Sequence, residues 1–94
     1  MAKFTVRVEL RDSKDADYDE LHDLMEENGF YRTIFTEAGK EYFLPNAEYT
    51  YSSKTKSCSD VADLAESVAS EVSKRPKILV TESCNRCRRN LDLA

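Results

Sequence analysis

Hydrophobic and polar residues alternate without interruption at the start of the chain, over residues 4–10. The apolar positions of this stretch are Phe4, Val6, Val8 and Leu10. A period of two residues is typical of a β-strand that buries one face and exposes the other. The sequence therefore predicts a strand here, whose solvated face carries Thr5, Arg7 and Glu9.

A helical period follows the polar turn 11–17. Apolar residues at positions 18, 21 and 25 form one stripe of an amphipathic helix. Either Asp15 or Asp17 is expected to cap its beginning, where negative charge favours the helix dipole. Gly29 suits the left-handed position that commonly ends a helix.

A second helical stripe is longer, and it runs through Val61, Leu64, Ala65, Val68, Ala69 and Val72. Steps of three and four residues over this length predict a second amphipathic helix. Ser57 and Asp60 have the spacing of a capping box, and Ser59 is the rival cap. Pro76 lies beyond the expected end of the helix.

The rest of the chain predicts three more strands. Residues 31–37 are rich in aromatic and β-branched side chains, and 37–40 reads as a hairpin turn with Gly39 at positive φ. The return strand begins near Glu41, is kinked at Pro45, and resumes its alternation at 47–51, so a long, bent strand is expected. Residues 77–82 are a short final strand.

The order strand, helix, strand, strand, helix, strand predicts an α+β fold of the ferredoxin-like βαββαβ type. The expected four-stranded antiparallel sheet has the order 4-1-3-2 and both helices on one face. Residues 1–83 would form this single domain, and 84–94 a polar, flexible C-terminal tail. Many unrelated functions use this fold, so the fold alone does not name one.

Net charge, the absence of long apolar runs and the number of cysteines limit the classes of function that the chain can have. The chain has 94 residues and a net charge of -4, which argues against broad, non-specific nucleic-acid binding but permits a local basic patch. No run approaches the roughly 18 apolar residues of a membrane span, and the N-terminus has no apolar signal region. A cytoplasmic protein with three free cysteines is expected.

Four segments carry a likeness to a known family: Phe4-Thr-Val-Arg-Val-Glu-Leu-Arg-Asp12, Tyr18-x-x-Leu21-His22-x-x-Met25-x-x-x-Gly29-Phe30, Tyr42-x-Leu44-Pro45-x-Ala47-Glu48-Tyr49 and Leu79-Val80-Thr81-Glu82-Ser83. In these the chain resembles the GhoS-like family, small bacterial endoribonuclease antitoxins of type V toxin–antitoxin systems. The resemblance implies a ferredoxin-like domain similar to the Cas2 nucleases, which acts on the mRNA of a small membrane toxin. Pairing into a homodimer is also implied. The segment 84–89 is not part of the family pattern.

Asp12, His22 and Arg11 are the catalytic candidates. The Cas2-like pattern implies an aspartate at the end of the first strand, where Asp12 stands. There it would bind Mg²⁺, the candidate cofactor, or it would simply cap the turn. His22, the only histidine, would act as a general acid or base, or be a half-buried surface residue. Arg11 would hold a phosphate.

Arg7 and Arg32 are the RNA-binding candidates, because guanidinium groups bind phosphate oxygens through two donors. Aromatic residues near them could stack on unpaired bases of single-stranded RNA. The alternative is that Arg7 pairs with Glu48 across the sheet and that the aromatic residues form the core. No DNA partner is expected.

Cys84 and Cys87 have the spacing of half a zinc site, for which Cys58 and His22 are the other ligand candidates. The sequence therefore supports three hypotheses. The first is a GhoS-like endoribonuclease that cleaves single-stranded toxin mRNA. The second is a non-catalytic module that binds RNA or a protein. The third is a small metal or redox protein that uses these cysteines.

Overall fold

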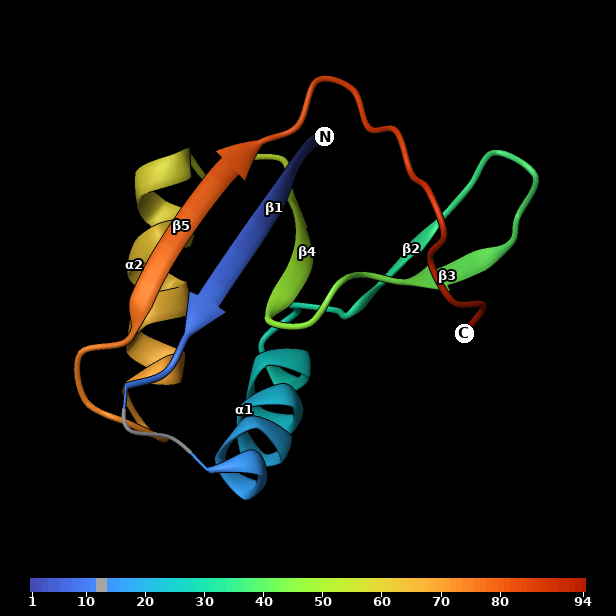
Figure 1. The fold of residues 1–94 in the computed structure, drawn as a ribbon. Helices are drawn as coiled ribbons and strands as arrows, with labels where there is room; N and C mark the ends of the chain where they lie inside the picture. The colour runs from blue at the N-terminus through green and yellow to red at the C-terminus, as the bar shows by residue number, and fades with distance from the viewer. Residues whose placement is uncertain (12–13) are drawn as a thin grey trace.

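Strand β1 (Ala2–Glu9) is the centre of a three-stranded antiparallel sheet, between β4 (Glu48–Ser53) and β5 (Lys77–Glu82) (Figure 1). The computed structural model describes residues 1–11 and 14–94 of the chain. Val6 lies opposite Tyr49 of β4 and opposite Val80 of β5. The predicted alternation is confirmed, since Phe4, Val6 and Val8 are fully buried.

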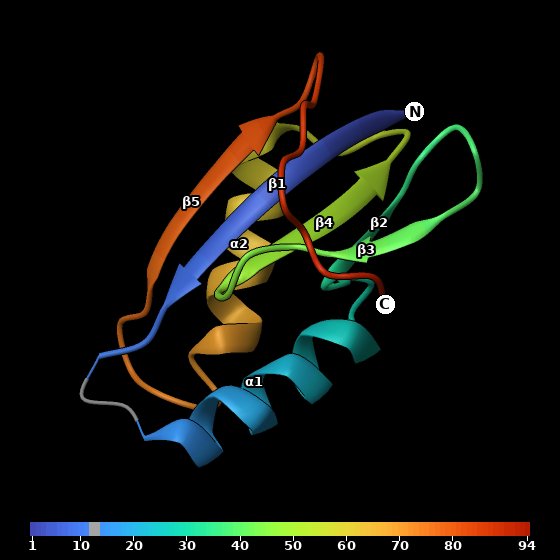
Figure 2. The ribbon, with the colours of Figure 1, turned by 45° about the vertical axis from the view of Figure 1, so that its right-hand side comes forward.

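Two helices, α1 (Asp15–Glu27) and α2 (Cys58–Ala69), cover the same face of this sheet (Figure 2). The core lies between the helices and the sheet. Its residues are Phe4, Val6, Val8, Leu10, Leu21, Met25, Phe30, Tyr49, Val61, Ala65, Val68 and Ala69. In the described part of the chain, neither helix is long and apolar enough to cross a membrane.

The helix ends follow local chemistry. The sequence predicted that Asp15 or Asp17 caps α1, and this prediction is wrong. The cap is Lys14, whose backbone N–H donates to Asp17 Oδ2 at 2.9 Å. Asp17 therefore stabilises the first turn from inside the helix. At the other end Gly29 has the expected positive φ, +88°, and Phe30 N–H donates to Met25 O, which is the Schellman pattern.

The capping box of α2 is confirmed. Ser57 is the cap, and its hydroxyl accepts from Asp60 N–H at 3.2 Å while Asp60 Oδ2 accepts from Ser57 N–H at 3.0 Å. The helix ends at Ala69, one turn before the end of the apolar stripe at Val72. Val72 still packs against the core, because Val72 N–H donates to Ala69 O in a turn that continues the same direction.

The predicted continuous four-stranded sheet with the order 4-1-3-2 is not what the structure shows. The main sheet has three strands, in the order β4-β1-β5, and β2 (Thr33–Phe35) and β3 (Glu41–Phe43) form a separate two-stranded sheet. Among the described residues, one isolated bridge joins Tyr31, which precedes β2, to Thr50 of β4 in the main sheet. The expected turn between β2 and β3 is present, with Gly39 at φ +81°.

The long, bent third strand of the prediction is two strands, β3 and β4. Between them Pro45 has no N–H to donate to a ladder, and Ala47 has a left-handed φ of +68°. Ala47 O instead accepts from Val8 N–H at 2.9 Å. Residues 44–47, which lie between β3 and β4, separate the hairpin from the main sheet.

Residues 83–94, here called the C-terminal segment, run from the end of β5 to the β2–β3 hairpin (Figure 1). Phe43 N–H donates to Asp92 O at 2.9 Å, and Ala94 N–H donates to Glu41 O at 3.1 Å. Leu93 forms a bridge with Tyr42. The C-terminal segment therefore lines the outer edge of β3.

Candidate functional site

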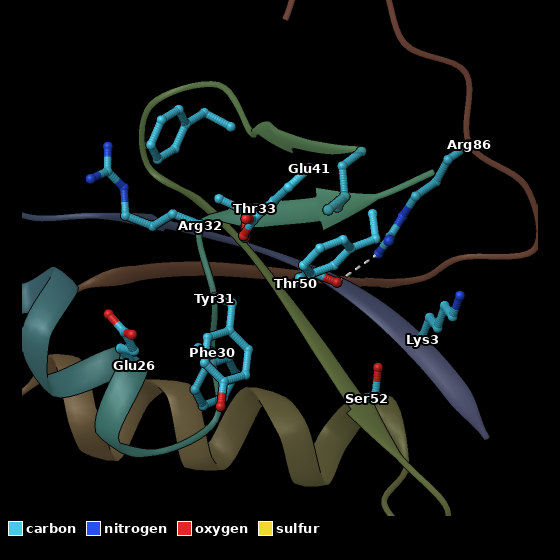
Figure 3. Close-up of a pocket in the computed structure, with 13 residues that line it drawn as sticks. Lys3, Glu26, Phe30, Tyr31, Arg32, Thr33, Glu41, Thr50, Ser52 and Arg86 are labelled. Atoms are coloured by element: carbon cyan, nitrogen blue, oxygen red, sulfur yellow. Dashed lines mark hydrogen bonds between the residues drawn. The ribbon is translucent and has the colours of Figure 1, made fainter. Parts of the chain in front are cut away.

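A groove of about 660 Å³ lies where the β2–β3 hairpin diverges from the main sheet (Figure 3). Its basic residues are Lys3 and Arg86 at one end and Arg32 at the other. Glu26 and Glu41 are its acidic residues. The groove thus holds a local surplus of basic side chains on a chain whose net charge is -4.

Four aromatic residues line the groove: Phe30, Tyr31, Phe35 and Phe43. Phe30 is fully buried and packs against Tyr51, with ring centroids 4.5 Å apart, so it belongs to the core. Tyr31 and Phe35, in contrast, are 50% and 69% exposed. Exposed aromatic rings beside basic side chains are what unpaired nucleotide bases stack on.

Arg32 lines the groove, and its charge acts on His22. Its guanidinium carbon lies 5.8 Å from the centroid of the Phe43 ring, and its positive charge is close enough to lower the pKa of His22. Of the predicted site residues, Arg32 lines the groove, whereas His22 is not among its lining residues and is affected by Arg32 only through its charge.

His22 is half-buried on α1, and its Nδ1 lies 2.6 Å from the Tyr49 hydroxyl. Burial lowers the pKa of the imidazole and Arg32 lowers it further, while Asp19 and Asp23 act in the opposite direction. The Tyr49 hydroxyl is fully buried, and burial raises its pKa, so it stays protonated. The lowered pKa favours the neutral imidazole, which is the form that a general base needs.

The other predicted residues lie elsewhere. Arg7 is exposed on the open face of β1, opposite Glu48 in register, yet within residues 1–11 and 14–94 the two form no ion pair. Arg11 Nε donates to Arg75 O at 2.7 Å, in the loop that precedes β5. Arg11 is thus occupied by a structural contact. Asp12 lies outside the described residues.

The cysteines do not converge on a metal site. All three are free thiols, with Cys84 and Cys87 exposed and Cys58 half-buried at the start of α2. Within the part of the chain that the structure describes, no group of three or more histidine, cysteine or acidic residues could hold a metal ion.

Sequence reasoning missed one basic residue of the groove, Lys3, and the hydroxyl partner of His22, Tyr49. For the arginines at 86, 88 and 89 it allowed an RNA contact but favoured a solvated tail. Lys3 stands one residue before the alternating stretch, so the pattern gave it no role. Tyr49 lies in the alternation of its strand and looks like an ordinary core residue. Arg86 lies in the predicted tail, and no local pattern indicates that its side chain reaches the sheet.

Comparisons with known proteins add no relative to this description. None of the protein-family models, curated proteins and solved structures that were searched matches the chain.

Proposed function

We propose that the protein binds single-stranded RNA in the groove between the β2–β3 hairpin and the main sheet. The observation that carries this proposal is that Lys3, Arg32 and Arg86 line the same groove as the half-exposed ring of Tyr31. Basic side chains bind the phosphate backbone, and aromatic rings stack on bases without requiring a sequence. A single strand leaves its bases unpaired and free to stack on such rings, whereas a duplex does not.

The chemistry proposed for this site is that of an endoribonuclease antitoxin, as in the GhoS-like family that the sequence resembles. His22 would act as the general base toward a ribose 2′-OH, and Arg32 would hold the scissile phosphate. The pKa of His22, which burial lowers and Arg32 lowers further, supports this assignment. Mg²⁺ at Asp12 is the alternative route to cleavage.

The fold type, the cellular location and the RNA target that we propose follow the same resemblance. The strands β5, β1 and β4 are adjacent in the order that a ferredoxin-like sheet gives to its strands 4, 1 and 3, and the Tyr31–Thr50 bridge lies where strand 2 would pair. This supports a ferredoxin-like origin with a displaced hairpin. A cytoplasmic protein that acts on toxin mRNA, as a monomer or a homodimer, is the expectation.

Binding and cleavage of one labelled single-stranded RNA test the two parts of the proposal separately. Arg32→Ala should weaken binding about tenfold, because it removes a charged phosphate ligand. The control Lys74→Ala removes an exposed positive charge that lies outside the groove, and it should leave binding unchanged. His22→Ala should abolish cleavage but not binding, and Asp12→Ala should abolish cleavage only if Mg²⁺ takes part.

The same assay, run with Mg²⁺ and with a chelator, distinguishes the alternatives. Binding without cleavage by the wild-type protein would favour the non-catalytic binding module. Equal affinity of the wild-type protein, Arg32→Ala and Lys74→Ala would exclude the groove as the binding site. Cleavage that survives both His22→Ala and Asp12→Ala would rule out these two residues as the catalytic groups.

A further inference from the structure

Arg86 reaches from the C-terminal segment onto the open face of the main sheet (Figure 3). Its Nη2 lies 3.2 Å from each of three acceptors, which are Phe4 O, Thr5 Oγ1 and Thr50 Oγ1. The guanidinium therefore lies across β1 and β4, beside the groove that Lys3 also lines.

The charge of Arg86 has no counterion in the described part of the chain. The one ion pair found there joins Lys77 and Glu9, at 3.7 Å. Arg86 is half-buried, and burial lowers its pKa. Its Nε is buried without a hydrogen-bond partner. A partly desolvated cation that is held only by neutral acceptors is costly unless an anion joins it.

The free donors of Arg86 suit a phosphate group. A guanidinium has five N–H donors. Nη2 already faces acceptors on the sheet and Nε is buried, so the donors left for a ligand are those of Nη1. The hydroxyls of Thr5 and Thr50, which hold the guanidinium, also fix its orientation on the sheet. A phosphate oxygen that accepts from Nη1 would form a charge-assisted hydrogen bond, which is stronger than a neutral one.

We propose that Arg86 is a phosphate-binding residue of the groove, and that the C-terminal segment places it there to hold the backbone of single-stranded RNA. This inference rests on the proposed function. It assigns a binding role to the C-terminal segment, because the segment brings a positive charge from residue 86 to the sheet formed by β1 and β4.

The test is the affinity of the full-length protein for a labelled single-stranded RNA, measured over a series of salt concentrations. Arg86→Ala should weaken binding about tenfold and reduce the slope of log affinity against log salt by about 0.7, the value for one lost phosphate contact. Arg86→Lys should lie between Arg86→Ala and the wild type, because it keeps the charge but loses the planar guanidinium that the two threonine hydroxyls orient.

Arg89→Ala is the matched control. Arg89 lies three residues further along the same segment, is exposed, and donates only to Arg88 O. Its loss should change the affinity by less than about twofold, as expected for a surface charge that makes no phosphate contact.

Three results would overturn the inference. Unchanged or tighter RNA binding by Arg86→Ala would overturn the inference about Arg86 and would leave the proposed function intact. Weaker binding by Arg86→Ala with an unchanged slope of log affinity against log salt would also overturn it, because Arg86 would then act only by holding the C-terminal segment. Failure of the wild-type protein to bind RNA would overturn both the inference and the proposed function.

Discussion

His22 is the residue whose environment is most informative for chemistry. Its Nδ1 contacts the buried Tyr49 hydroxyl, and its pKa is lowered mainly by burial and then by Arg32. The unfolded chain does not have this environment, so a histidine in it titrates near 6.5. Between the folded and the unfolded pKa, the unfolded chain therefore binds more protons than the folded protein does.

Titration of His22 by NMR checks this. The single histidine of the chain should titrate below 6.5. Arg32→Gln should raise the pKa of His22, because it removes a positive charge, and Asp19→Asn should lower it, because it removes a negative one. Opposite shifts, or none, would show that these charges do not act on the imidazole.

The stability of the protein should follow the same titration. As the pH falls from the unfolded pKa toward the lower folded pKa, the free energy of unfolding should decrease, because protonation then favours the unfolded chain. In His22→Gln this component of the pH dependence should be absent. Chemical denaturation at several pH values measures it, and the same slope in both proteins would contradict the assignment.

At the scale of an element, the start of α2 is determined by one side chain. The Ser57 hydroxyl accepts from Asp60 N–H, whereas Ser59, the rival cap in the sequence, lies inside the helix. The reciprocal pair satisfies two donors that the first turn of a helix otherwise leaves to water. The helix carries Val61 and Ala65 into the core, so its beginning matters for the whole fold.

Ser57→Ala should lower the free energy of unfolding by about 1 kcal/mol, the usual cost of a lost helix cap. Ser59→Ala is the matched control and should change it by less than about 0.5 kcal/mol, as for most surface positions. Urea unfolding of the two variants beside the wild type gives both values. A larger loss for Ser59→Ala would mean that the cap lies at Ser59.

At the scale of the whole molecule, the C-terminal segment joins the two sheets. It contacts the main sheet through Arg86 and the hairpin through Asp92 and Leu93. The core lies within residues 4–69, so the segment contributes little to it. We therefore expect it to hold the hairpin in position relative to the main sheet, beside the groove that Arg86 lines.

A chain that ends at Ser83 should therefore keep its core and lose protection in the hairpin. The Phe43 amide, which donates to Asp92 O in the full chain, should exchange about tenfold faster, as expected for one lost hydrogen bond. The Val8 amide, which donates to Ala47 O, is the internal control and should not change. Equal loss of protection at both amides would show that the segment stabilises the whole fold.

Much of the fold could be predicted because its signals are local. The alternation around Val6, the capping box at Ser57 and the left-handed Gly29 each depend on a few neighbouring residues, and each is confirmed. The candidate site could be predicted only in part. Arg32 and His22 were identified as separate residues, and no local pattern indicates that they lie close enough to interact.

The sequence by itself determined the order of helices and strands, apart from the division between β3 and β4, and which face of each is apolar, because periodicity and capping depend on neighbouring residues. Only the tertiary structure decided that the hairpin leaves the main sheet, since this depends on how the kink at Pro45 directs β3 away from β4. It also decided that Arg86 lies against Thr5 and Thr50. Those contacts join residues 81 and 36 positions apart, and no local pattern can encode a contact over such a separation.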